Sequence, residues 1–152
     1  MLKAIAAILI VLAVAFWFFR TRAPSVPLPE GIAGLPDGTT VAVEIADTPA
    51  SRSRGLSGRD DLPKGQGMLF IYDTPGVYGF WMQGMRFPID MVWMDEGKVV
   101  TVASDVPYQG ASQFAITNPT APADMILELP AGYASAHGVV EGATLDIRLP
   151  SR

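Results

Sequence analysis

Two acidic residues stand in strongly apolar stretches of the chain, where an unpaired charge would be costly. Asp90 lies in FWMQGMRFPIDMVWM, residues 80–94, and Glu128 lies in MILEL, residues 125–129. A buried carboxylate must be hydrogen-bonded or paired. Two carboxylates on neighbouring strands could bind a ligand or act as a general acid and a general base. The competing interpretation is structural: the carboxylates would fix loops by binding turn amides or arginines.

Other polar and aromatic side chains could complete a site around these carboxylates. Arginine can hold a carboxylate or a substrate anion with two parallel hydrogen bonds. Trp81 could stack on a planar or sugar ligand, although we favour a core position for it. The predicted ligand-binding residues are Arg54, Arg59, Trp81, Gln83, Arg86, Asp90 and Glu128.

The residue types that other familiar chemistries need are missing or poorly placed. The sequence has no cysteine, which excludes thiol catalysis, disulfides and thiolate metal sites. His137 is the only histidine, so a zinc site with two histidines cannot form. Ser57, in GLSGR, lacks the G-x-S-x-G spacing of a hydrolase nucleophile. We therefore predict no metal and no cofactor.

Two methionine pairs, Met82/Met85 and Met91/Met94, raise the question of copper, because thioether sulfurs suit Cu(I). On a strand, residues three apart point to opposite faces, so one ion could not bind both sulfurs of a pair. Methionine is also a common filler of apolar cores. Core packing is therefore the predicted role.

The chain begins with an apolar segment flanked by positive charges. Sixteen apolar residues run from Ala4 to Phe19, between Lys3 and Arg20. At about 1.5 Å per residue they span roughly 24 Å, slightly less than a bilayer core of about 30 Å. Residues 13–15 resemble a signal-peptidase site, but the aromatic cluster at 16–19 is typical of a helix leaving the bilayer. We predict that residues 1–22 are an uncleaved signal anchor that holds the domain outside the cytoplasm, on the periplasmic or cell-surface face.

The next segment has the composition of a linker. Residues 23–38 contain four prolines and three glycines and show no apolar periodicity, so we predict a linker there and a single folded domain at 39–152. Beyond residue 22 the chain has eight Lys and Arg against fifteen Asp and Glu, a net charge of −7. No basic cluster stands out, and nucleic acid is therefore not a predicted partner.

The apolar pattern of the domain predicts short strands. A helix is predicted at 48–55, because Thr48 can cap it, Pro49 suits its first position and Gly55 suits its end. A second short helix is predicted at 131–138. The predicted strands are 39–47, 67–72, 78–82, 89–94, 98–103, 125–129 and 143–149, with a hairpin turn at 95–97.

These elements predict a mainly β domain of the β-rich α+β class. It would be a compact, antiparallel, barrel-like fold with two short helices, preceded by the N-terminal transmembrane or signal helix. The stretch 104–124 fits neither a strand nor a helix. Long loops of this kind are often functional.

Several landmarks occur in the order and spacing of a known family. They are EIADTPASRSRGL at 44–56, Arg59, GMLF at 67–70, FWM at 80–82, PID at 88–90, Pro107 and LELPAG at 127–132. Over residues 40–149 the chain resembles domain-of-unknown-function family 192. The resemblance implies a β-rich domain of the cell envelope, often carried behind an anchor, with no established activity. The chain departs from the family at Gln83-Gly84-Met85, where a Lys-Asn-Thr-like trio is usual, and at Gly142-Ala143, where Gly-Asp is usual.

The combined prediction is a membrane-tethered extracytoplasmic domain that binds a small molecule or an envelope protein without turnover. Its site would lie at the mouth formed by the 83–90 turn, Arg59, Glu128 and the 104–124 loop. The alternative is a hydrolase-type enzyme with Asp90 and Glu128 about 5 to 10 Å apart across an open cleft. A pure partner-binding module would instead expose an apolar patch of several hundred Å². We expect Asp90 to anchor a turn first and to meet a ligand second.

Overall fold

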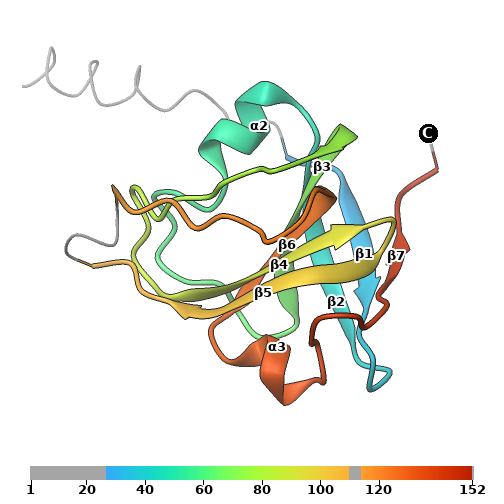
Figure 1. Ribbon diagram of the computed structural model, residues 1–152. Helices are drawn as coiled ribbons and strands as arrows, with labels where there is room; N and C mark the ends of the chain where they lie inside the picture. Colours follow the sequence, from blue (N-terminus) through green and yellow to red (C-terminus); the bar gives the residue numbers. More distant parts are fainter. Residues whose placement is uncertain (1–26, 110–113, 152) are drawn as a thin grey trace, which may run out of the picture.

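Seven strands form one curled sheet, and two short helices lie against it (Figure 1). The computed structural model describes residues 27–109 and 114–151. The strand order is β5-β4-β6-β3-β2-β1-β7. The elements are β1 (Glu30–Gly34), β2 (Thr40–Ala46), α2 (Pro49–Arg54), β3 (Gln66–Gly76), β4 (Ile89–Asp95), β5 (Lys98–Val106), β6 (Ala123–Pro130), α3 (Tyr133–Ala136) and β7 (Asp146–Arg148).

The predicted mainly β fold with two short helices is confirmed. Neighbouring strands are antiparallel except for β2 and β3, which pair in parallel. A parallel pair needs a long crossover connection. Here α2 and the loop at 55–65 provide it, which places α2 beside the sheet.

Local signals explain the start and the end of α2. The Thr48 hydroxyl accepts a hydrogen bond of 3.1 Å from the Ser51 amide, and the Ser51 hydroxyl accepts one of 3.0 Å from the Thr48 amide. This reciprocal pair is a capping box. Pro49 occupies the first turn, and Gly55 ends the helix with a positive φ of 49°. The prediction for this helix is confirmed.

The two faces of the sheet carry two separate apolar cores. The inner core, on the face covered by α3, joins residues of β1 and β5, which a flat sheet would keep far apart. The outer core lies on the opposite face, under the loops that follow α2 and β3. Inner residues include Ala33, Val43, Leu69, Val92, Val99, Leu127, Leu129 and Ala134. Outer residues include Leu56, Leu62, Met68, Phe70, Met82, Met91, Trp93 and Ile126.

Part of the predicted linker is a strand. Residues 30–34 form β1, which pairs with β2 and β7, so the linker predicted at 23–38 does not extend over its second half. Ala33 is fully buried there. A Cβ on Gly31 would come within 2.9 Å of the Arg148 carbonyl oxygen, so the glycine permits close strand packing. The glycines that suggested flexibility therefore serve the sheet.

The strand predicted at 78–82 is wrong. Only Phe80 makes a strand-like contact, a single bridge to Thr117. The other residues of 78–82 are irregular, and Trp81 is 55% exposed instead of lying in the core as predicted. The Phe-Trp-Met run looks like a buried strand, but only Met82 of that run is fully buried. The closing strand is also shorter than predicted, since β7 spans three residues.

The predicted signal anchor at 1–22 lies outside the described residues. Within residues 27–109 and 114–151, none of the helices has the length and hydropathy needed to cross a bilayer.

Candidate functional site

Asp90 is a fully buried carboxylate that holds three turns together. One of its oxygens accepts hydrogen bonds from the backbone amides of Asp105, at 2.8 Å, and Gly132, at 3.0 Å. The other accepts a bond of 2.8 Å from the Ala134 amide, at the start of α3. Asp105 has a positive φ of 52°, an uncommon conformation that this contact supports. The structure places Asp90 in the turn-anchoring role that we expected first.

The two carboxylates do not form a pair. Asp90 stands opposite Leu129 in the register of β4 and β6, while Glu128 stands opposite Met91. Because successive side chains on a strand point to opposite faces, Asp90 and Glu128 lie on different sides of the sheet. Asp90 belongs with the inner core and α3, and Glu128 with the outer face. The predicted acid–base pair across an open cleft is therefore not present.

Glu128 sits in a cross-strand row on the outer face. Glu44, Met68, Glu128 and Met91 are successive partners across β2, β3, β6 and β4. The two methionines flank Glu128 and remove it from water, and its residue is only 5% exposed. Its Oε2 atom is buried and has no hydrogen-bond partner among the described residues. A buried polar atom without a partner is rare and costs free energy.

Burial sets the protonation state of Glu128. Desolvation raises its pKa to about 8, and the positive charge of Arg59 lowers the pKa only in part. The carboxyl group therefore keeps its proton at neutral pH. A strongly shifted pKa that arises from burial next to a cavity is a common sign of a functional site.

Arg59 does not neutralise Glu128, because it is bound to Glu44. Its two terminal nitrogens donate to the two Glu44 carboxylate oxygens at 2.5 and 2.7 Å, in a half-buried pair. The hydrogen bonds from Arg59 lower the pKa of Glu44, and the hydrogen bond to Glu44 raises that of Arg59. This fork geometry fixes the guanidinium on Glu44, which leaves Glu128 without a direct partner.

A small pocket of about 40 Å³ opens above Glu128; we call it the Glu128 pocket. Its lining combines apolar side chains with two arginines of α2. The lining residues are Arg52, Ser53, Arg54, Gly55, Leu56, Ser57, Phe70, Phe80, Trp81, Met85 and Glu128. Three of the predicted site residues, Arg54, Trp81 and Glu128, therefore meet at one place.

Backbone contacts hold the walls of the Glu128 pocket. The Ser57 hydroxyl donates to the Gln83 carbonyl at 2.8 Å, and the Gly58 amide donates to the Gly84 carbonyl at 2.9 Å. These bonds join the loop after α2 to the 82–85 turn. Two backbone bonds between Phe80 and Thr117, of 2.9 and 2.7 Å, fix the next segment. The walls thus come from segments that are distant in the sequence.

The remaining predicted site residues lie outside the pocket. Arg59 is adjacent but bound to Glu44. Gln83 is exposed and contributes only its carbonyl oxygen, as an acceptor for Ser57. Arg86 is exposed and forms an ion pair with Asp60. The 104–124 loop supplies no lining residue, although Thr117 supports Phe80, and residues 110–113 lie outside the described part.

Sequence reasoning missed several lining residues. Arg52 belongs to the same helix as Arg54, and its guanidinium lies 4.7 Å from the centre of the Tyr72 ring. Phe70 and Phe80 meet edge to face at 4.8 Å. The sequence places Arg52 in the last turn before Gly55, and Phe80 directly after Gly79. These positions indicate a pocket only when the packing of α2 is known.

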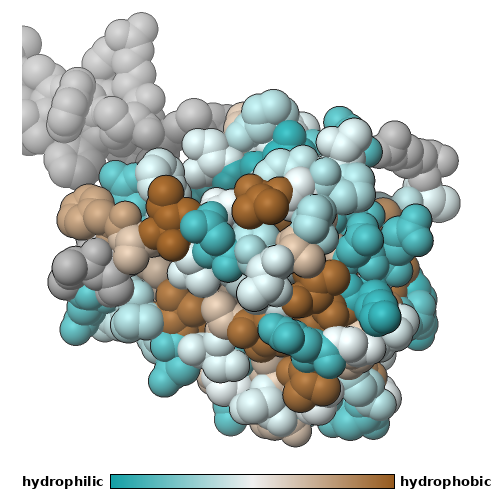
Figure 2. Space-filling view, viewed as in Figure 1, coloured by the Kyte–Doolittle hydropathy of each residue, from teal (hydrophilic) through white to brown (hydrophobic). Residues whose placement is uncertain are grey.

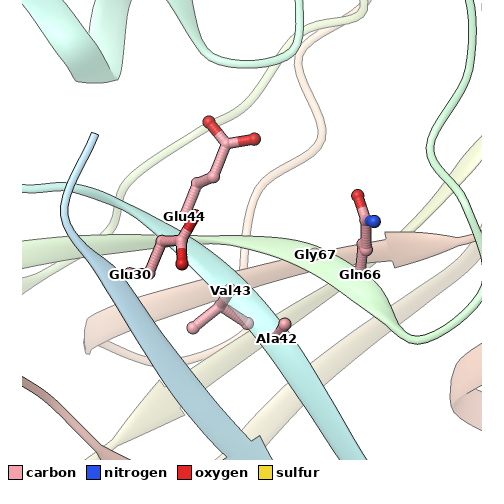
Figure 3. A pocket seen from close by; sticks show the side chains of 6 residues that line it. All are labelled: Glu30, Ala42, Val43, Glu44, Gln66 and Gly67. Atoms are coloured by element: carbon pink, nitrogen blue, oxygen red, sulfur yellow. The ribbon is translucent and has the colours of Figure 1, made fainter. Parts of the chain in front are cut away.

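In two other pockets, none of the described lining residues has a buried side-chain polar atom without a partner. One, of about 130 Å³, lies over β1, β2 and β3, where Figure 3 shows the cross-strand neighbours Glu30 and Glu44 side by side. Glu44 is already bound to Arg59. The other, of about 200 Å³, is lined by Pro29, Ile45, Asp47, Ile71, Asp73, Leu149 and Pro150. Neither offers the unmet hydrogen bond that marks the Glu128 pocket.

The four methionines of the two pairs pack in the cores. Met91 and Met94 lie in the outer and the inner core, on opposite faces as the strand pattern predicted. Met82 and Met85 both lie in the outer core, because they belong to a turn closed by a bond from the Met85 amide to the Met82 carbonyl. For that pair, the expectation of opposite faces was wrong.

Comparisons with known proteins agree with the fold. The model of the family DUF192, described as uncharacterized ACR, matches residues 33–147. No curated protein matches the chain. A solved structure from Sinorhizobium meliloti 1021, named as a candidate transcription regulator, is 29% identical, with 81% of this chain and 97% of that chain covered and a TM-score of 0.72. A protein of unknown function from Novosphingobium aromaticivorans DSM 12444 is 26% identical, with 82% and 89% covered and a TM-score of 0.69.

Proposed function

This chain belongs to the DUF192 family, and we propose that it is a membrane-tethered envelope domain that binds a small molecule in the Glu128 pocket without turnover. The observation that carries the proposal is the buried Oε2 atom of Glu128, which has no partner among the described residues. A ligand that enters the pocket would supply the missing hydrogen bond. Concave, mostly apolar pockets with a few polar groups are the usual form of small-molecule sites.

The chemistry of the pocket favours binding over catalysis. Among the described residues that line the pocket, Glu128 is the only one with a carboxyl group, and Asp90 lies on the opposite face of the sheet. The Ser57 hydroxyl donates its hydrogen bond to the Gln83 carbonyl instead of facing a base. General acid–base catalysis needs a second group within reach of the reacting atoms. The lining offers a place to hold a ligand but no second acid or base.

Binding of a large protein partner has less support. The exposed apolar side chains include Val77, Trp81, Phe114 and Ile116. Figure 2 shows apolar residues interspersed with polar ones on the face in view, instead of one continuous apolar field. Of these side chains, Trp81 lines the Glu128 pocket, where a small ligand could stack on its ring.

The name of the Sinorhizobium relative suggests DNA, but the charge of this chain does not. Its net charge beyond residue 22 is −7. A DNA-binding domain needs a basic face to neutralise phosphates. We therefore do not extend a nucleic-acid role to this chain.

The membrane attachment in the proposal is supported by the sequence of residues 1–22. Full-length protein produced in a Gram-negative host should sediment with membranes and resist extraction by high salt. A chain that starts at residue 23 behind a cleavable leader should be recovered in the periplasmic fraction. Recovery of the full-length chain in the cytosol would contradict this part of the proposal.

The binding function is tested by filling the pocket. Full-length protein in detergent micelles is screened against small aromatic molecules and sugars, with two-dimensional amide NMR spectra as the measurement. We expect hits to shift the amides of residues 52–57 and 80–85. In Ser53→Trp, an indole from the rim should occupy the pocket and weaken the hits at least about tenfold, a change of about 1.4 kcal/mol.

Ser135→Trp is the matched control, because it adds the same side chain to α3 on the other face of the sheet. This variant should keep the affinities of the wild type. The proposal is wrong if no hit reaches the pocket, or if hits bind Ser53→Trp as well as they bind the wild type.

A further inference from the structure

We infer that the Glu128 pocket selects a small carboxylate with an apolar or planar body. The inference rests on the proposed binding function and adds the chemical class of the ligand. Its basis is that the free polar groups of the pocket are donors: a guanidinium at the rim and a protonated acid at the floor. A carboxylate is an acceptor that can use both.

Arg54 is the free guanidinium. It is exposed at the rim of the pocket, and it makes no ion pair or hydrogen bond with any described residue. Arg52, two residues earlier, is occupied, since its Nη1 donates to the carbonyls of Asp47 at 2.7 Å and Ile71 at 2.8 Å. Arginine binds a carboxylate with two parallel hydrogen bonds. Arg54 is therefore the group available to bind an incoming anion.

The local charge of the pocket also favours an anion. The domain is acidic, yet Arg52 and Arg54 both line this pocket and Arg59 lies next to it. Two of these arginines come from α2 and one from the following loop, and Arg59 is the one whose charge lowers the pKa of Glu128. A protonated Glu128 contributes no opposing charge. A pocket lined by one sign of charge concentrates ligands of the other sign.

Glu128 would act as a hydrogen-bond donor to the ligand. Burial raises the pKa of its carboxyl group to about 8, so the proton is present at neutral pH. The O–H group can then donate to a ligand carboxylate, which removes the unmet hydrogen bond at the floor. Above about pH 8 the group ionises, and two negative charges would repel each other.

The walls define the body of the ligand. Leu56, Phe70, Phe80 and Met85 are apolar, and the edge-to-face contact between Phe70 and Phe80 holds their rings in place. Trp81, 55% exposed, offers a ring face at the mouth. The space inside the pocket is small, about 40 Å³, which is enough for roughly three waters. A carboxylate group can occupy that space, and an aromatic ring attached to it would lie at the mouth against Trp81.

Three probes of one shape and different charge test the inference: benzoate, benzamide and benzylammonium. Each is titrated into the full-length protein in detergent micelles at pH 6.5, and the indole N–H resonance of Trp81 is followed by NMR after assignment with Trp81→Phe. We expect benzoate to bind with a dissociation constant of about 1 mM or lower. Benzamide and benzylammonium should bind at least about tenfold more weakly.

Variants separate the two polar contacts. Arg54→Gln should weaken benzoate at least about tenfold and leave benzamide unchanged, because only the charged contact is lost. Arg86→Gln, an exposed arginine outside the pocket, is the matched control and should bind like the wild type. Glu128→Gln keeps a donor and should hold benzoate at both pH 6.5 and pH 9, whereas the wild type should lose affinity at pH 9.

The outcomes distinguish the inference of a carboxylate ligand from the proposed binding function. If benzylammonium or benzamide binds at this pocket as tightly as benzoate, the carboxylate class is wrong and the binding function stands. If none of the three probes moves Trp81, the carboxylate class is also wrong, and the fragment screen then decides the binding function. If Arg54→Gln binds benzoate like the wild type, Arg54 is not the anion-binding group and the inference is overturned.

Discussion

Replacing Asp90 by alanine should lower the free energy of unfolding by about 3 to 5 kcal/mol, the largest effect that we expect from any single side chain. The carboxylate accepts hydrogen bonds from the amides of Asp105, Gly132 and Ala134. Alanine leaves these donors without a partner, and each unmet buried donor costs about 1 to 3 kcal/mol. Urea unfolding of the full-length protein measures the change.

Two further variants keep the Asp90 prediction testable. Asp90→Asn keeps the volume and one acceptor oxygen, so it should fold with a smaller loss of about 1 to 3 kcal/mol. Asp124→Ala is the matched control, because its carboxylate accepts a single exposed amide, from Glu96. It should cost less than about 1 kcal/mol. A loss below 1 kcal/mol for Asp90→Ala would show that the three turns do not depend on this carboxylate.

Replacing Glu128 by glutamine should raise the free energy of unfolding, and this increase should grow with pH. The pKa of Glu128 is about 8 in the folded protein, against 4.5 for an ordinary glutamate. Between these values the unfolded chain has lost the proton and the folded protein has kept it. The folded state then binds more protons, so the stability of the wild type falls as pH rises, by up to about 1.4 kcal/mol per pH unit.

Glutamine cannot ionise, so this loss disappears in the variant. Relative to the wild type, Glu128→Gln should gain stability steadily from about pH 5 to about pH 8, reaching a few kcal/mol, and the difference should level off above pH 8. Urea unfolding at one-unit intervals of pH measures it. Glu141→Gln removes an equal formal charge from the surface and shows the effect of lost charge alone. A constant difference between pH 5 and pH 8 would argue against a buried, protonated Glu128.

Local features of the sequence predicted the parts of the fold that depend on near neighbours. Thr48, Pro49 and Gly55 define α2 because a cap, a fixed φ and a positive φ act within a few residues. The 95–97 hairpin turn is likewise local, with Glu96 and Gly97 both at positive φ. The apolar neighbours of Asp90 and Glu128 correctly indicated that both carboxylates are buried.

The site itself depends on register, which no local pattern contains. Whether Asp90 and Glu128 share a face is decided by the pairing of Asp90 with Leu129 and of Glu128 with Met91. A shift of one residue would have brought both carboxylates to the same side. Residues 78–82 were wrongly predicted to be a strand for a related reason. The bridge between Phe80 and Thr117, which are distant in the sequence, decides where Phe80 and Trp81 lie, and apolar content does not.

The central claim, that Glu128 is a buried acid which stays protonated in a pocket at neutral pH, can be measured at that carboxyl group. The side-chain carboxyl carbon of Glu128 is followed by ¹³C NMR of the full-length protein from pH 4 to pH 10, and its resonance is assigned by its absence in Glu128→Gln. The predicted midpoint of the titration is about 8. A midpoint near the ordinary value of 4.5 would contradict the claim, because the pocket would then hold a carboxylate anion at neutral pH.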